Sequence, residues 1–332
     1  MDPFAVLWTL HKVVVNLAVV GFCGNVLVFL TILKTKALHN VTNYMLLNLA
    51  IADAFVGIQS TLGATIMETH RRGIGTSGYC TPVFIYNFKL FFMFVYLKKI
   101  SFANSVFSLT LATFERYIGI IKPLHYSTFF TKRRLIIMLL FVWLVPFLTE
   151  AYTPIFYIPM YIQDNCTIPS MENYPMVMTS GILHFIFFFI IPCISLAFMY
   201  VRILINLKQG ARHLENQGIQ GPPQELLRAH KKVTKSLLLV VAAFFILMLP
   251  GQLLENIILY SSMFDEYYIF AELLSQTISI LELLNSTINP ILYGFKYSQL
   301  RRACVSMLCP CAHHSKRSNQ VVHSQQVASV TT

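Results

Sequence analysis

The chain has 332 residues, of which 56% are hydrophobic and 12% charged, and its formal net charge is +11. Soluble domains carry roughly twice that share of charged residues, so a water-soluble fold is excluded and the apolar residues require a bilayer. Most of the Lys and Arg residues lie in alternate loops and in the C-terminal tail, which argues against a nucleic-acid partner and indicates the cytoplasmic side of a membrane protein.

Seven apolar runs are each long enough to cross a bilayer, which takes about 20 helical residues. They predict membrane-spanning helices at residues 13–33, 44–67, 91–121, 135–161, 176–201, 236–254 and 269–295. The basic stretches are 34–40, 122–134, 202–235 and the tail from residue 296. Because basic loops are cytoplasmic, the N-terminus is expected outside the cell.

The expected fold is all-α, a seven-transmembrane-helix bundle over residues 1–304, followed by a cytoplasmic, disordered tail over residues 305–332. The stretch 296–302 is amphipathic and predicts a short eighth helix on the inner leaflet. The polar stretch 210–230 contains Gly-Pro-Pro and predicts a flexible loop between the fifth and sixth helices.

Several polar residues lie inside the predicted spans, where an ionisable group is costly and needs a partner. They are Asn25, Asp53, Ser105, Asn285, Ser286 and Asn289. Asn285 and Asn289 are four residues apart and share a helix face, so the group can form one cluster around the Asp53 carboxylate. Two interpretations remain open: a sodium site coupled to helix movement, or a hydrogen-bond network that holds helices together.

Two short motifs stand near the cytoplasmic ends of predicted helices. Glu115-Arg116-Tyr117 ends the third span, and such a tripeptide is also compatible with an arginine that reaches the interface beside its neighbour. Asn289-Pro290-Ile291-Leu292-Tyr293 in the seventh span is more specific. Its proline frees a backbone carbonyl and permits a kink, and the flanking Asn and Tyr supply donors there.

Together these features resemble the rhodopsin-like (class A) G-protein-coupled receptors, over residues from about 13 to 304. The matching elements are Gly24-Asn25, LNLAIAD ending at Asp53, Glu115-Arg116-Tyr117, Trp143, Pro192, Tyr200, Phe244, Pro250 and NPILY at 289–293. No lysine precedes NPILY in the seventh span, so the chain is not an opsin.

The resemblance implies a role for each matching position. For G-protein coupling and activation these are Glu115, Arg116, Tyr117, Tyr200, Asn289, Pro290 and Tyr293. The packing that relays ligand binding inward is expected at Val106, Pro192, Phe244 and Pro250, and a sodium ion at Asp53, Ser105, Asn285, Ser286 and Asn289. A disulfide is implied between Cys80 and Cys166, with a free Cys80 as the alternative.

The same resemblance implies a multi-pass plasma-membrane receptor with no enzymatic activity and no cofactor other than the sodium ion. The implied partners are an extracellular ligand, a heterotrimeric G protein, arrestin and receptor kinases. A seven-helix transporter or channel is the alternative, although the sequence lacks the internal repeats typical of transporters.

The sequence departs from the family in three places. Met248 and Leu247 stand where the family has its switch tryptophan and a nearby cysteine. The spacing from Cys80 to Arg116 is about eleven residues longer than usual, close to three helical turns, so either the third helix is longer or residues 81–90 form a loop. His230 and Thr234 replace the acidic partner of Arg116, which predicts raised ligand-free signalling.

Candidate ligand contacts lie in the outer halves of the helices. Lys98 occupies the position where amine receptors carry an aspartate, which argues against biogenic amines, and Glu282 is placed to approach it. This pair is either structural or in direct contact with the ligand. The other candidates are His184, Gln252 and Glu255. A peptide is slightly favoured over a small polar ligand.

Covalent modification is expected at two places. Asn165-Cys166-Thr167 is a glycosylation sequon in an outer loop. Cys304, Cys309 and Cys311 follow the predicted eighth helix and are candidates for palmitoylation. A metal site formed by Cys309, Cys311, His313 and His314 is the rival interpretation, although such crowded spacing fits tetrahedral coordination poorly.

Overall fold

A computed structural model of the chain describes residues 3–73, 82–151, 155, 175–218, 221–260, 268–296 and 298–308. Helices make up this part of the chain, and it contains no strand. The spans are α1 (Pro3–Lys34), α2 (Val41–Gly73), α3 (Pro82–Ile121), α5 (Lys132–Thr149), α7 (Pro175–Phe185) continued by η4 (Ile186–Ile190) and α8 (Ile191–Asn216), α9 (Pro222–Tyr260) and α11 (Tyr268–Lys296). The short helices are η1 (Lys36–Leu38), α4 (Pro123–Phe129) and α12 (Ser298–Leu308).

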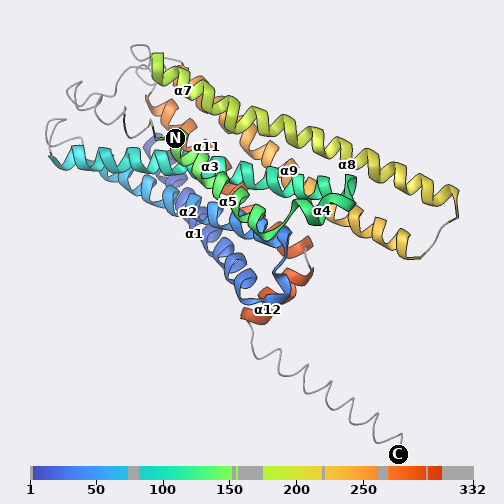
Figure 1. Cartoon of the computed structure of the whole chain (residues 1–332). Helices are drawn as coiled ribbons and strands as arrows, with labels where there is room; N and C mark the ends of the chain where they lie inside the picture. Colours follow the sequence, from blue (N-terminus) through green and yellow to red (C-terminus); the bar gives the residue numbers. More distant parts are fainter. Residues whose placement is uncertain are drawn as a thin grey trace, which may run out of the picture.

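The long helices pack side by side as a bundle, as the sequence predicts (Figure 1). α3 contacts α2, α5 and α8, whereas α1 lies against α2 and α11. By length and composition alone, three described stretches are long and apolar enough to cross a membrane: Ala5–Lys34, Val41–Gly63 and Gly181–Asn216, with Leu238–Leu254 as a shorter apolar helix. α3 and α11 also contain ionisable residues, such as Glu115 and Glu282, whose side chains are buried inside the bundle.

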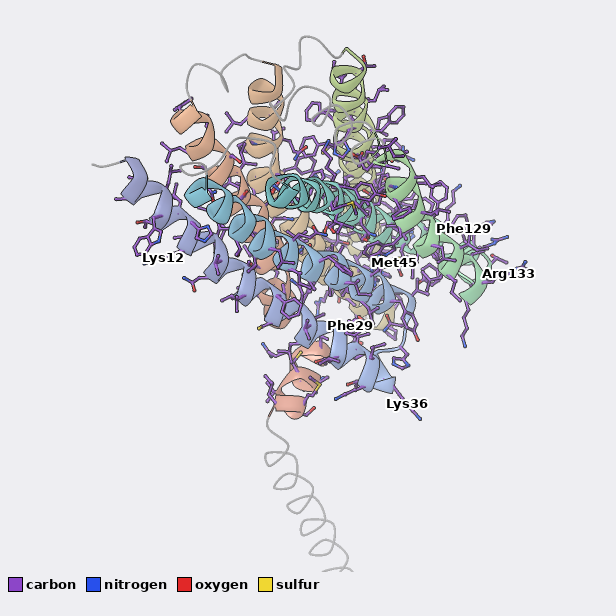
Figure 2. The ribbon with its side chains drawn as sticks, turned by 90° about the vertical axis from the view of Figure 1, so that its left-hand side faces the viewer. Lys12, Phe29, Lys36, Met45, Phe129 and Arg133 are labelled. Atoms are coloured by element: carbon purple, nitrogen blue, oxygen red, sulfur yellow. The ribbon has the colours of Figure 1, made fainter. Side chains whose placement is uncertain are left out.

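The outer surface of the bundle is apolar where lipid would surround it. α5 exposes Leu140, Phe141 and Leu148, and α8 exposes Ile194 and Phe198. Figure 2 shows Lys12 in the first half of α1 and Lys36 in η1, just after α1 ends, with Phe29 between them. Charged side chains at the two ends of an apolar helix can reach the two membrane surfaces.

The predicted flexible loop at 210–230 is wrong. α8 continues to Asn216 and α9 already begins at Pro222, so both helices project beyond the rest of the bundle (Figure 1). The turn between them contains Gly218 and Gly221, whose φ angles are +63° and +89°. Left-handed backbone of this kind favours glycine, and proline suits the first position of the next helix.

Two further boundaries differ from or refine the prediction. α5 ends at Thr149, within the predicted fourth span, and the Glu150 backbone N–H still donates to Pro146 O. Most of residues 152–161 lie outside the described part of the chain, so the remainder of that span stays a prediction. The extra residues before Arg116 lengthen the third helix, since α3 begins at Pro82 and has 40 residues. Residues 81–90 are therefore helical from Pro82 onward and do not form a loop.

α12 is the predicted short eighth helix. Leu300 is buried in the bundle, whereas Arg301 and Arg302 are exposed, so one face is apolar and the other basic. α12 contacts α1 and α11 and follows the end of α11 (Figure 1). It runs to Leu308, past the expected domain boundary at residue 304, and that division stays a prediction.

Candidate functional site

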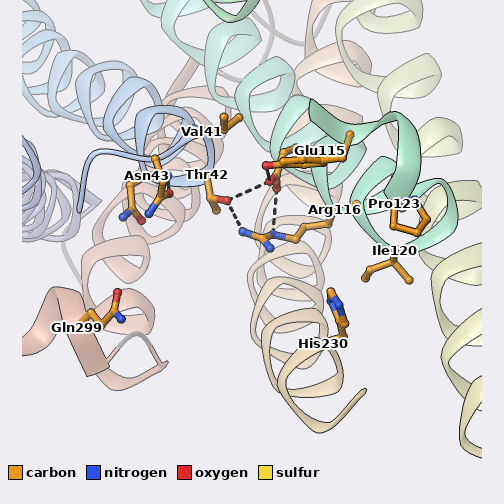
Figure 3. A pocket seen from close by; sticks show the side chains of 12 residues that line it. Val41, Thr42, Asn43, Glu115, Arg116, Ile120, Pro123, His230 and Gln299 are labelled. Atoms are coloured by element: carbon orange, nitrogen blue, oxygen red, sulfur yellow. Dashed lines mark hydrogen bonds and ion pairs between the residues drawn. The ribbon is translucent and has the colours of Figure 1, made fainter. Parts of the chain in front are cut away.

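A cavity of about 460 Å³ opens between the ends of α2, α3, α4, α9 and α12. This is the end of the bundle that carries the basic loops, and is therefore the predicted cytoplasmic side. Figure 3 shows the side chains that line it. They are Asn40, Val41, Thr42, Asn43, Glu115, Arg116, Gly119, Ile120, Pro123, Tyr126, His230 and Gln299.

Glu115 organises the wall of this cavity. Its carboxylate is 2% exposed, and its Oε2 lies 3.0 Å from Arg116 Nε. Its Oε1 accepts hydrogen bonds from the Thr42 hydroxyl at 3.1 Å and from the Tyr126 hydroxyl at 2.5 Å. The Arg116 guanidinium also donates to Thr42 Oγ1 (Figure 3). Arg116 is thus held toward α2 by a network that spans α2, α3 and α4.

Thr42 and Tyr126 were not predicted as members of this site. Tyr126 reaches Glu115 because Pro123 begins α4 directly after α3, and the short helix folds back beside the end of α3. Burial and the Glu115 carboxylate raise the pKa of the Tyr126 hydroxyl above its ordinary value. The hydroxyl therefore stays protonated and acts as a donor to Glu115.

No acidic residue of α9 faces Arg116 in the described part of the cavity wall, where Glu115 is the one carboxylate. His230 of α9 lines the cavity instead, and Thr234 is buried one turn farther along. Burial, and secondarily the Arg116 charge, lower the pKa of the His230 imidazole. Both effects favour the neutral imidazole, because burial disfavours a charged side chain and a second cation beside Arg116 would be repelled.

The other residues expected in activation lie in the core directly above the cavity. Tyr200 and Tyr293 are both buried and belong to one hydrophobic cluster with Leu109 and Phe244. Tyr117 is partly buried and packs against the Phe198 ring of α8 at 6.4 Å. Asn289 and Pro290 lie one turn before Tyr293 within α11, and Asn289 bonds to Asp53.

Some of the residues that were expected to relay ligand binding inward pack together in the structure. Val106 and Phe244 share the same buried cluster, and Pro192 is buried in α8 just after the π-helical turn Ile186–Ile190. Met248 is buried in this cluster, next to the position of Phe244 on α9. Pro250 does not join it, since its ring is exposed on the outside of α9. A buried methionine therefore occupies the place of the family's tryptophan in the packed core.

The predicted polar cluster around Asp53 is present in the structure. Ser105 and Ser286 donate to Asp53 Oδ1 at 2.8 and 3.1 Å, and Asn289 donates to Oδ2 at 2.8 Å. These bonds join α2, α3 and α11. Asn25 belongs to a second layer, because it donates to the Ser286 carbonyl at 3.0 Å.

The Asp53 cluster offers oxygen ligands that suit a sodium ion. A small cavity of about 10 Å³ beside it is lined by Ser105, Asn285 and Asn289, among others. That volume is close to the space of a single water molecule. Carboxylate, hydroxyl and amide oxygens are the ligands of hard cations, so the residues fit a small cation. Asn285 lines this cavity but has no described bond to Asp53.

Two ion-pair systems lie on either side of α3 in its outer half. Lys98 Nζ is 2.5 Å from Glu282 Oε2 of α11. On the other side, Glu150 Oε1 lies 2.5 Å from His184 Nδ1, which is placed to donate to it, and Glu150 Oε2 lies 3.9 Å from Lys99 Nζ. Sequence reasoning missed Glu150, although an ionisable residue inside an apolar run was the signal that identified Asp53.

The remaining predicted positions divide into two groups. Gln252 is buried in α9. The Cys304 thiol lies 3.4 Å from Thr31 Oγ1, inside the contact between α12 and α1. Outside the described residues or side chains lie Cys80, Asn165, Cys166, Glu255, Cys309 and Cys311, so those expectations stay predictions.

Comparison with known proteins adds an independent line of observation. Residues 24–293 match the family model of the 7 transmembrane receptor (rhodopsin family). The chain is 27% identical to human trace amine-associated receptor 9 over 86% of this chain and 80% of that receptor. It is 24% identical to rat somatostatin receptor type 4, over 91% and 73% of the two chains. It is 26% identical to the dog adenosine receptor A2a, over 89% and 71%.

Proposed function

Because the chain belongs to the rhodopsin family of seven-transmembrane receptors, we propose that it binds an extracellular ligand and activates a heterotrimeric G protein at the plasma membrane. It is a multi-pass membrane receptor and not an enzyme. The observation that carries the proposal is the cytoplasmic cavity with Arg116 in its wall. A concave site at a helix-bundle end suits a partner helix, whose C-terminal carbonyls an arginine can contact.

Activation in this proposal is a shift between two arrangements of the bundle. In the arrangement described here, Glu115 and Thr42 hold Arg116 against α2 and α3. Outward movement of α9 would widen the cavity, and Arg116 would then exchange these contacts for the G protein. Tyr200 and Tyr293, which are packed just above, would reorganise beside it. Receptor kinases and arrestin are proposed as later partners of the active arrangement.

A sodium ion is proposed as an allosteric modulator of this shift. Asp53 and Ser105 would hold it, with Asn285 and Asn289 beside it, and the ion would supply positive charge next to the Asp53 carboxylate. The support is the oxygen-rich cluster and the small cavity at its edge. A ligand shifts the receptor toward the active arrangement only if it binds that arrangement more tightly, and the ratio of its two affinities sets the size of the shift.

The ligand itself is proposed only by class. The receptors matched here are named for trace amines, somatostatin and adenosine, so the matches do not select one class. Lys98, where amine receptors carry an aspartate, argues against an amine because an ammonium group would meet a cation. A peptide or a small polar ligand remains.

Arg116→Ala is expected to abolish ligand-free signalling by the receptor. The experiment measures G-protein activation in cells at matched surface expression, without any ligand, across the main G-protein classes. Arg301→Ala is the matched control, because it removes an exposed cytoplasmic arginine that does not line the cavity. A signal in the Arg116 variant equal to that of the unchanged receptor would contradict the proposal. No signal above vector controls from the unchanged receptor would contradict the raised basal activity that His230 predicts.

His230→Glu is expected to lower ligand-free signalling a few-fold. The new carboxylate would face Arg116 across the cavity and tie α9 to α3 in the closed arrangement. A pair at a partly solvated site contributes up to about 1 kcal/mol, which sets the size of the effect. His230→Gln is the control, because it keeps a neutral polar side chain. Equal basal signals from the Glu and Gln variants would show that position 230 does not restrain α9.

A further inference from the structure

His230 lies on α9, the helix whose outward movement opens the cytoplasmic cavity in the proposed function. It lines the same cavity as Arg116 of α3, and Figure 3 shows both side chains in the cavity wall. The imidazole is half-buried and precedes the predicted membrane span at 236–254. It can therefore exchange protons with the cytoplasm, and histidine is the side chain whose charge changes near neutral pH.

Arg116 is the charged group of the cavity wall that acts on His230. Its guanidinium disfavours a positive imidazole. Glu115 of α3 also lines the cavity, but its carboxylate already pairs with Arg116 and accepts hydrogen bonds from Thr42 and Tyr126. The Tyr126 hydroxyl of α4 is a neutral donor in this network. Protonated His230 would therefore meet a like charge and no free carboxylate in the described wall.

The other elements around His230 bring no further charge into the described part of the cavity wall. α2 contributes the neutral Asn43 and α12 the neutral Gln299, and α11 contributes no described side chain to this wall. α8 packs against the start of α9 at Gly210, which lies next to Leu227. Exposed basic side chains on these two helices are screened by solvent; they are Lys208, Arg212, Arg228, Lys231 and Lys235.

Proton binding at His230 is coupled to the position of α9. In the closed arrangement, burial first and the Arg116 charge second lower the pKa of the His230 imidazole. Both effects weaken when α9 moves outward, because the imidazole gains solvent and its distance from the guanidinium grows. The open arrangement therefore binds the proton more tightly than the closed one. A ligand shifts an equilibrium toward the arrangement that it binds more tightly, and here the ligand is a proton.

We propose that His230 is a cytoplasmic proton sensor, and that its protonation favours the outward, signalling position of α9. This inference rests on the proposed function and adds a regulator to it, because an acidified cytoplasm would raise ligand-free signalling. The juxtaposition that carries it is a titratable side chain on the moving helix and a fixed cation on α3, in the wall of one cavity.

The sign and the pH range follow from the same coupling. Well above the ordinary histidine pKa of 6.5, neither arrangement holds the proton, and pH has no effect through His230. As the pH falls through this value toward the lowered pKa of the closed arrangement, the open arrangement gains the proton first and its population rises. A tenfold difference in proton affinity between the two arrangements would change their ratio by at most about tenfold.

The test measures the position of α9 directly, without a G protein. The full-length receptor in lipid nanodiscs carries one spin label on α4 and one on α9, attached through unnatural amino acids. The labels replace Leu124, which is 90% exposed, and Leu226, which is 60% exposed. The distribution of label distances is recorded from about pH 7.5 to about pH 5.5, a range that brackets the ordinary histidine pKa. The fraction of receptors with the longer distance reports the open arrangement.

The open fraction is expected to rise several-fold as the pH falls across this range. His230→Gln should hold the fraction constant, because glutamine does not titrate. His230→Lys keeps a positive charge throughout the range and should raise the fraction even at about pH 7.5. His213→Gln is the matched control and should keep the pH response, because it removes an exposed histidine of α8 that does not line the cavity.

Any one of three results would overturn the inference. These are an open fraction that does not change with pH in the unchanged receptor, an equal pH response in His230→Gln, and no rise of the open fraction in His230→Lys. None of them bears on the Arg116→Ala experiment, which measures G-protein activation in cells. Failure of the proton sensor and failure of the proposed receptor function are therefore distinguishable.

Discussion

Gly57→Ala is expected to lower the free energy of unfolding by about 1–3 kcal/mol, the usual cost of forcing an extra group into a packed site. A Cβ atom at Gly57 of α2 would lie 2.8 Å from the Ala18 carbonyl oxygen and 3.3 Å from Phe22 Cβ of α1. The nearer atom belongs to the α1 backbone, so it cannot rotate away as the end of a side chain could. The two helices would have to separate, and both also pack against α11.

Gly63→Ala in the same helix provides the control for this prediction. A Cβ atom there meets no atom of the described residues within 4 Å. Alanine is a better helix former than glycine by roughly 0.5–1 kcal/mol, so Gly63→Ala should be neutral or stabilising. The measurement is the thermal midpoint of both purified variants in the same detergent. Equal midpoints would show that the α1–α2 contact is looser than the structure describes.

Close backbone contacts of this kind could not be located from the sequence, whereas the helices themselves could. Hydrophobic runs set by the thickness of a bilayer predicted the last span as 269–295, and α11 covers Tyr268–Lys296. The signal is strong because it depends on local composition alone. Gly57 carries no comparable signal, since its importance comes from the α1 carbonyl that faces it.

Errors in the fold occurred where composition misrepresented local structure. The stretch 210–230 is polar, but it contains good helix formers such as Leu214, Glu215 and Leu226. Two helices therefore extend into it, and a glycine turn separates them. The polar composition correctly indicated that the segment lies outside the membrane, but a polar segment can still be helical.

Some members of the two sites could be predicted from the sequence and others could not, depending on whether they lie inside an apolar run. The Asp53 cluster could be anticipated, because each member is a polar residue inside an apolar run and helical spacing places two of them on one face. Glu150 carried the same signal and was overlooked. Tyr126 and Thr42 carried none, since they lie in or beside polar loops. Their place around Glu115 depends on how α4 and the start of α2 pack against α3.

Glu115→Gln is expected to raise ligand-free signalling by about tenfold or more. The substitution keeps the shape of the side chain but removes the charge that pairs with Arg116 at 3.0 Å. Glu115 is buried, and breaking a buried pair costs about 3–5 kcal/mol in the arrangement that contains it. The substitution shifts the equilibrium toward the active arrangement only by the difference between its cost in the resting arrangement and its cost in the active one. Each 1.4 kcal/mol of that difference changes the ratio of the two arrangements about tenfold.

The measurement is ligand-free G-protein activation at matched surface expression, with Tyr126→Phe as a graded comparison. That variant removes one hydrogen bond to the Glu115 carboxylate and leaves the ion pair in place, so its basal signal should fall between those of the unchanged receptor and the Gln variant. Adding Arg116→Ala to Glu115→Gln should abolish the basal signal, because the double variant has no arginine at position 116 that could contact the G protein. A basal signal unchanged by Glu115→Gln would mean that Thr42 and the packing of α9, and not the ion pair, restrain Arg116.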